Sequence, residues 1–156
     1  MKIACVKYVG LAAGGVEKYI QNIAVILANN GHQVDYYYTN LPKLIGSSWI
    51  HPDNKEYRKQ FLEQNGVKVC PVRIASRYTD CAIPWNGTDF FDVFKESEYD
   101  VVQTARGGYP EFPFNQMSLP IIDSIHSDVG EDRPNIKKAI LICNWQAKRW
   151  QNGVAI

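Results

Sequence analysis

Residues 10–17, Gly-Leu-Ala-Ala-Gly-Gly-Val-Glu, join a short apolar run to an amphipathic segment and are the residues best suited to chemistry. Where a buried strand turns directly into a helix, the first helical N–H groups have no partner within the helix, and the helix dipole adds positive charge. Glycines let a ligand approach this backbone closely. The pattern therefore indicates a site for a phosphate group or another anion at Gly14 and Gly15. A tight strand-to-helix turn without a ligand is the alternative explanation.

Two familiar phosphate-binding motifs do not fit this loop. The P-loop needs Gly-x-x-x-x-Gly-Lys-Ser/Thr, and although Gly10 and Gly15 have the spacing, Val16 and Glu17 follow them. The dinucleotide fingerprint Gly-x-Gly-x-x-Gly fails as well, because Ala12 stands at the middle glycine position. A P-loop nucleotidase and a nicotinamide-dependent dehydrogenase both lose support.

Polar residues follow other predicted strands, at the edge where ligands bind in open parallel sheets. Residues 106–109 follow one such strand, and His126 with Asp128 follows another. We expect these loops to converge with residues 10–15 and His126 to be the candidate for chemistry, although a histidine hydrogen-bonded within its own loop is the alternative. Four side chains would suit an acceptor sugar or phosphate through aromatic faces and charge, with a solvated loop as the alternative: Arg77, Trp85, Arg106 and Tyr109.

Short apolar runs rich in β-branched residues alternate along the chain with amphipathic segments. The runs predict strands over residues 3–9, 34–39, 67–72, 99–104, 120–125 and 138–143. The segments predict helices over residues 16–30, 54–65, 89–96 and 144–151, and residues 73–88 are expected to form a long surface loop. This alternation predicts an α/β fold: a single Rossmann-like domain with a parallel sheet and helices on both faces.

Composition narrows the classes of function. The 156 residues make one domain of ordinary size, 46% hydrophobic and 21% charged, with a net charge of +1. A nucleic-acid partner is not expected, because such proteins usually carry a strong basic excess. No run approaches the roughly 20 apolar residues of a membrane span, and the first strand begins without room for a signal peptide, so we expect a cytoplasmic protein. Four well-separated cysteines without metal-ligand spacing predict reduced thiols and no metal site.

Several motifs occur in an order known from one family of enzymes. Residues 14–19 read Gly-Gly-Val-Glu-Lys-Tyr, and residues 31–34 read Gly-His-Gln-Val. Asp-Val-Val follows at 100–102, and residues 120–126 run from a proline through a strand to a histidine. The chain thereby resembles the N-terminal half of a family 4 glycosyltransferase of the GT-B architecture. The resemblance covers nearly the whole chain, but the middle, from about residue 40 to residue 97, matches only in outline.

The resemblance implies roles for particular residues. The backbone of Gly14 and Gly15 would lie against the diphosphate of a nucleotide-sugar donor, and His126 would contact the donor sugar near the reacting centre. The implied reaction is a retaining, metal-independent transfer of that sugar to a saccharide or lipid-linked acceptor, with no cofactor. Glu17, in the first helical turn, is expected to have only a structural role.

The resemblance also implies that half of the active site lies outside these residues. GT-B enzymes have two Rossmann-like halves with the active site between them. The Glu-x7-Glu motif of the donor-binding half does not occur here, and neither does the Asp-x-Asp of metal-dependent single-domain glycosyltransferases. We therefore expect residues 1–156 to form the acceptor-side domain and to be inactive alone. These residues would be a truncated gene product, an expressed fragment of a longer protein, or one subunit of a split enzyme whose donor-binding C-terminal domain is a separate chain.

Other interpretations stay open. One is non-catalytic: a Rossmann-like binding module that holds an anionic metabolite or a protein partner at the glycine loop. A flavodoxin-like nucleotide protein has less support, since its loop would be richer in Ser and Thr than residues 11–13. The surface that would meet a second domain is a candidate for self-association. One stretch near the C-terminal end is basic and aromatic: Lys137, Lys138, Lys148, Arg149 and Trp150. It predicts a solvated helix face, and the alternative is a weak peripheral contact with the inner membrane face.

Overall fold

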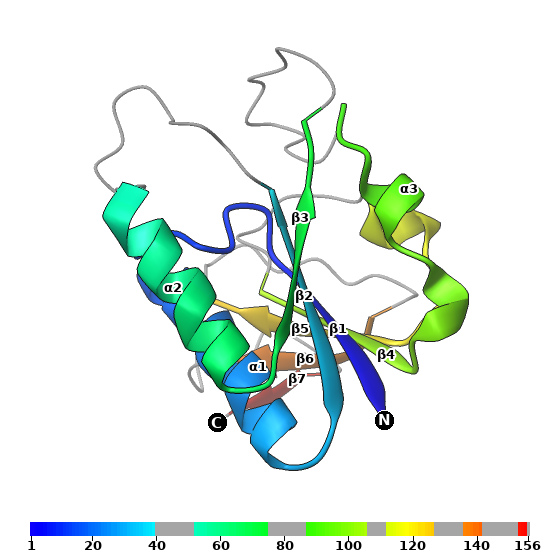
Figure 1. Cartoon of the computed structure of the whole chain (residues 1–156). Helices are drawn as coiled ribbons and strands as arrows, with labels where there is room; N and C mark the ends of the chain where they lie inside the picture. The colour runs from blue at the N-terminus through cyan, green and yellow to red at the C-terminus, as the bar shows by residue number, and fades with distance from the viewer. Residues whose placement is uncertain (40–51, 75–86, 106–111, 127–135, 142–152, 156) are drawn as a thin grey trace.

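The computed structural model describes residues 1–39, 52–74, 87–105, 112–126, 136–141 and 153–155 (Figure 1). Its strands are β1 (Lys2–Val6), β2 (Gln33–Thr39), β3 (Lys68–Val72), β4 (Val101–Thr104), β5 (Ile121–Ile125), β6 (Ile136–Leu141) and β7 (Gly153–Ala155). Its α-helices are α1 (Gly15–Asn29), α2 (Pro52–Gln64) and α3 (Phe90–Val93), and its short 3-10 helices are η1 (Glu96–Glu98) and η2 (Phe114–Gln116).

The seven strands of the described residues form one parallel sheet in the order β3-β2-β1-β4-β5-β6-β7. β1 lies inside the sheet, where Ile3 is in register with Val34 of β2 on one side and with Val101 of β4 on the other. Parallel strands end at a common edge, so the loop after β1 lies at the same edge as Ala105, which follows β4, and His126, which follows β5. The sheet confirms the predicted fold class.

Helices cover both faces of the sheet, with α1 and α2 on one side and α3 on the other (Figure 1). The apolar stripe of α1 buries Ile20 and Ala24 against the first face, and α2 adds Leu62. The second face packs mainly aromatic rings, among which Phe94 stacks on Tyr99 with centroids 5.2 Å apart. These two apolar clusters explain why the strands tolerate burial on both sides, as the sequence predicts.

The structure corrects several element boundaries. β1 ends at Val6 rather than at residue 9, because the chain turns from there toward α1. The helix expected over residues 89–96 is divided between α3 and η1, since Phe94 is extended and buried against Tyr99. The sequence did not predict β7, because a strand of three residues is too short to show an alternation of apolar and polar residues. The helix predicted over residues 144–151 lies outside the described residues.

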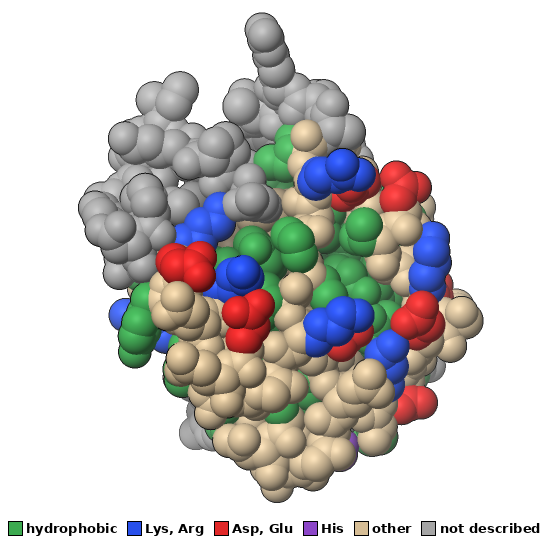
Figure 2. Space-filling model, in the orientation of Figure 1, with side chains coloured by type: hydrophobic (Ala, Val, Ile, Leu, Met, Phe, Trp, Pro, Cys, Tyr) green, Lys and Arg blue, Asp and Glu red, His purple; other side chains and the backbone are tan. Residues whose placement is uncertain are grey.

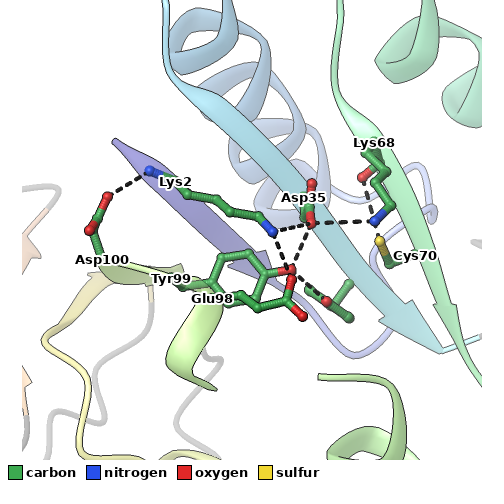
Figure 3. A network of polar contacts seen from close by, with 8 residues as sticks. Lys2, Asp35, Lys68, Cys70, Glu98, Tyr99 and Asp100 are labelled. Carbon is green, nitrogen blue, oxygen red and sulfur yellow. Dashed lines mark hydrogen bonds and ion pairs between the residues drawn. The ribbon is translucent and has the colours of Figure 1, made fainter. Parts of the chain in front are cut away.

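A polar network lies at the amino edge of the sheet (Figure 3). Asp35 of β2 is 1% exposed and accepts a 2.6 Å hydrogen bond from the Tyr99 hydroxyl. Lys2 and Lys68 approach the same carboxylate oxygen from opposite sides, at 3.9 and 3.7 Å. The Tyr37 hydroxyl lies 2.6 Å from that of Tyr99, and burial raises the pKa of Tyr37 to about 12 and raises the pKa of Tyr99 as well. The network therefore ties β2 to β1, β3 and the residues before β4.

Charges of both signs lie next to one another on the face drawn in Figure 2. Lys and Arg side chains alternate there with Asp and Glu around hydrophobic side chains, and neither sign forms an extended patch over the described part of this face. The mixture agrees with the net charge of +1. No helix among the described residues is long and apolar enough to cross a membrane.

Candidate functional site

The loop between β1 and α1 is held in place from inside the protein. The carbonyl oxygen of Gly10 accepts hydrogen bonds from Gln21 Nε2 at 2.6 Å and from the Tyr36 hydroxyl at 2.8 Å, and both side chains are fully buried. A side chain on Gly10 has no room, because its Cβ would lie 2.8 Å from Tyr36 Cε1 and 2.9 Å from Tyr38 Cβ. Gly10 therefore serves packing, and the buried contacts give the loop a defined course toward α1.

The N-terminus of α1 lies at the end of this loop. Gly14 precedes the helix with an extended backbone and provides no side-chain cap, and Gly15 begins the helix facing open space. The Glu17 side chain folds back, so that its carboxylate occupies the space that a side chain on Gly14 would need. Such a carboxylate interacts favourably with the unpaired N–H groups and the helix dipole. A carboxylate of the protein itself thus lies where the sequence predicts an anion.

Lys7, directly after β1, neutralises this carboxylate. Its Nζ lies 3.3 Å from Glu17 Oε1 and donates a 3.0 Å hydrogen bond to the carbonyl oxygen of Ala105 at the end of β4. The Lys7 and Glu17 side chains are only 14% and 12% exposed, so the pair is screened less by water than a surface ion pair. The sequence analysis missed Lys7, whose signal is a lysine placed between an apolar strand and a glycine loop.

His126 follows β5 and faces the same region. Its ring packs edge-on against the ring of Tyr19 from α1, with centroids 4.5 Å apart. Its Nε2 atom is buried without a hydrogen-bond partner among the described residues. Burial and the nearby charge of Lys7 lower the pKa of His126, although Asp123 and Glu17 partly oppose this shift. His126 is therefore a neutral imidazole at neutral pH, able to donate one hydrogen bond and accept another.

A chain of polar side chains supports the ring beside His126. The Tyr19 hydroxyl lies 3.2 Å from the Ser124 hydroxyl, which accepts a 3.2 Å hydrogen bond from Gln103 Nε2. Ser124 and Gln103 are buried within β5 and β4. The sequence analysis included Tyr19 in the motif of residues 14–19 and gave it no role of its own. Gln103 and Ser124 are polar residues in otherwise apolar strands, and this pattern could have indicated that they bind a neighbouring side chain.

The structure brings three of the predicted site residues to one edge of the sheet. Gly14 and Gly15 begin α1, and the next turn of that helix contacts His126 through Tyr19. The four side chains predicted for an acceptor, as well as Asp128, lie outside the described residues: Arg77, Trp85, Arg106 and Tyr109. Within the described ranges, no three His, Cys, Asp or Glu side chains are grouped as a metal site.

Alanine at the two adjacent glycines is expected to change stability in opposite directions. In Gly15→Ala the new methyl group meets open space and alanine favours the helix, so the free energy of unfolding should rise by about 0.5 kcal/mol. In Gly14→Ala the methyl group must displace the Glu17 carboxylate and break its pair with Lys7, so the free energy of unfolding should fall by about 1 kcal/mol. Urea unfolding of both variants measures the difference. Equal stabilities would contradict the position assigned to Glu17.

Comparison with known proteins gives a similarity of fold. No protein-family model matches the chain, and no curated protein sequence matches it. Among solved structures, the crystal structure of MurG from Acinetobacter baumannii matches with a TM-score of 0.56 at 13% sequence identity. The match covers 90% of this chain and 40% of the MurG chain. The chain thus has the Rossmann-like α/β fold of one half of a GT-B architecture.

Proposed function

We propose that this chain is the N-terminal, acceptor-side domain of a GT-B glycosyltransferase. The observation that carries the proposal is the meeting of the α1 N-terminus and His126 at the carboxyl edge of the parallel sheet, where open sheets bind ligands. The similarity of fold to MurG, itself a GT-B glycosyltransferase, supports the same assignment. Because the chain spans only 40% of MurG, the activity of a complete enzyme is part of the proposal.

Each group at this edge has a role in the proposed reaction. The N–H groups at Gly14 and Gly15 would bind the diphosphate of a nucleotide-sugar donor. The neutral imidazole of His126 would hydrogen-bond a hydroxyl of the donor sugar through Nε2, which has no partner among the described residues. Catalysis would then rest on positioning the reactants and on stabilising the charge of the departing diphosphate.

The finer features of the proposal rest on the sequence motifs. The order of motifs characteristic of family 4 supports a retaining transfer without a metal ion. The acceptor would be a saccharide or a lipid-linked saccharide, and the lipid-linked case would place the enzyme at the inner membrane face. The other wall of the site would come from a donor-binding domain with a Glu-x7-Glu motif, on the same gene product or on a separate chain.

Sugar transfer by the complete enzyme tests the proposal. The purified chain is combined with the Glu-x7-Glu domain encoded downstream of it or in an adjacent gene, and supplied with UDP-, GDP- and ADP-linked radiolabelled sugars and membrane or saccharide extracts. We expect transfer that needs both halves and persists in EDTA. If no encoded donor-binding half exists, or if the combined halves bind sugar nucleotides without transferring sugar, the non-catalytic binding module becomes the better description.

A further inference from the structure

Glu17 and Lys7 form a charged pair directly on the proposed donor site. Both side chains are more than four-fifths buried, and they are 3.3 Å apart. The N-cap residue of α1 is Gly14, which makes no side-chain cap hydrogen bond. Glu17 lies within the first turn and is not the N-cap residue. Its carboxylate instead lies over Gly14, in space that exists only because Gly14 has no side chain. The Glu17 carboxylate therefore lies at the helix N-terminus, where the proposed function places the diphosphate.

Two anions cannot share this place without a large electrostatic penalty. Like charges a few ångströms apart repel strongly at a partly buried site, because little water screens them. Lys7 cannot offset both anions, since its Nζ is already held between Glu17 and the carbonyl oxygen of Ala105. Glu17 has to turn away from the helix N-terminus for such an anion to bind, and its side chain, which is 12% exposed, already reaches solvent.

We infer that Glu17 is a built-in occupant of the anion site, and that Lys7 exchanges its partner from Glu17 to the diphosphate when the ligand binds. This inference rests on the proposed function and adds two residues to it. Lys7 is the cation of the site, and Glu17 is a competitor that an incoming anion must displace. The Nε2 atom of His126 is a second buried polar group at the same edge, and it has no hydrogen-bond partner among the described residues.

The exchange makes the site selective for highly charged anions. For a ligand to bind, its interactions with Lys7 and the helix N-terminus must release more free energy than the protein loses when Glu17 gives up the same contacts. A diphosphate carries more charge and more acceptor oxygens than a monovalent anion, so it displaces the carboxylate more effectively. Weakly charged metabolites at this edge would leave the Lys7–Glu17 pair in place.

Pyrophosphate binding to the purified chain tests the inference by isothermal titration calorimetry at low ionic strength. Glu17→Gln keeps the size of the side chain and removes the competing charge, so the dissociation constant should fall about tenfold, equivalent to about 1.4 kcal/mol. Lys7→Met should raise the dissociation constant at least about tenfold, because it removes the cation of the site and its charge-assisted hydrogen bond to the anion. Lys18→Met removes the same charge from an exposed position one residue beyond Glu17 and should change binding less than about twofold.

Each outcome decides the inference. Pyrophosphate that binds Glu17→Gln no more tightly than the unchanged protein, or that binds neither, overturns it. Should Lys7→Met fail to fold, as circular dichroism would report, Lys7→Arg keeps the charge and Glu17→Gln still decides alone. The sugar-transfer assay is separate: transfer without the pyrophosphate pattern overturns the role of Glu17 alone, and the pyrophosphate pattern without transfer overturns the proposed function alone.

Discussion

His126→Ala is expected to lower the rate of sugar transfer by the complete enzyme about 10²-fold, the usual effect of removing one preorganised hydrogen-bonding group from an active site. The loss should appear mainly in kcat, because a contact at the reacting centre strengthens in the transition state. The measurement is the initial rate of transfer from the radiolabelled donor, with the chain and its donor-binding half at equal concentrations.

His32→Ala is the matched control for this prediction. His32 lies just before β2, at the amino edge of the sheet, and is therefore remote from the carboxyl edge where His126 lies. Its replacement should leave the rate within about twofold. Full activity in His126→Ala, or an equal loss in both variants, would show that His126 does not contact the reacting sugar.

The pH dependence of the rate separates a chemical role of His126 from a structural one. Because burial and Lys7 lower the pKa of His126, the imidazole stays neutral at neutral pH and gains its proton only below the ordinary histidine value of 6.5. The rate should therefore fall on acidification below that value. His126→Asn, which keeps a donor and an acceptor but does not titrate there, should retain part of the rate and lose this acid limb.

Asp35→Ala is expected to lower the free energy of unfolding by about 2–3 kcal/mol. Asp35 is 1% exposed, and it accepts the Tyr99 hydrogen bond between the ammonium groups of Lys2 and Lys68. Hydrogen bonds to charged groups contribute roughly 1.5–3 kcal/mol, and the deletion also leaves a small cavity. For a chain of this size the midpoint of thermal unfolding should fall by about 5–10 °C.

Lys68→Ala provides the comparison at the same network. The Lys68 side chain is 71% exposed, so its 3.7 Å ion pair with Asp35 is screened by water and its loss should change stability by less than about 1 kcal/mol. Asp35→Asn keeps the side-chain volume and an acceptor for the Tyr99 hydroxyl. Its loss in free energy of unfolding should lie between the losses in Asp35→Ala and Lys68→Ala. Thermal and urea unfolding of the three variants give the order. A loss in Lys68→Ala as large as that in Asp35→Ala would mean that the exposed ion pair, and not the buried hydrogen bond, stabilises this edge.

Local patterns predicted most of the described elements and the place of the glycine loop and His126 along the sheet. The glycine-rich junction after an apolar strand predicted the β1–α1 turn, and Gly31, with φ of 83°, ends α1 at the point where the sequence indicates. The place of His126 at the carboxyl edge of the sheet was predicted because it follows a predicted strand. Such features depend on neighbours within a few residues, so they can be read from one stretch of sequence.

Long-range partners could not be read in this way. Asp35 is one residue in a run of tyrosines, and its hydrogen-bond partner Tyr99 is 64 residues away in the chain. The division of the helix expected over residues 89–96 had the same origin, since Phe94 left helical geometry and packs edge-on against Tyr37 of the distant strand β2, with ring centroids 5.4 Å apart. Burial against a distant residue decided both, and no local propensity contains that information.

The sequence by itself determined the α/β class, the parallel sheet and the positions of the glycine loop and His126, because hydrophobic periodicity and turn residues act over short stretches. Only the tertiary structure decided what surrounds these groups. It placed Lys7 and Glu17 on the N-terminus of α1, and it brought Tyr19 against His126. The physical reason is that these contacts join β1, α1 and β5, and their geometry follows from strand order and helix packing, which residue spacing alone does not specify.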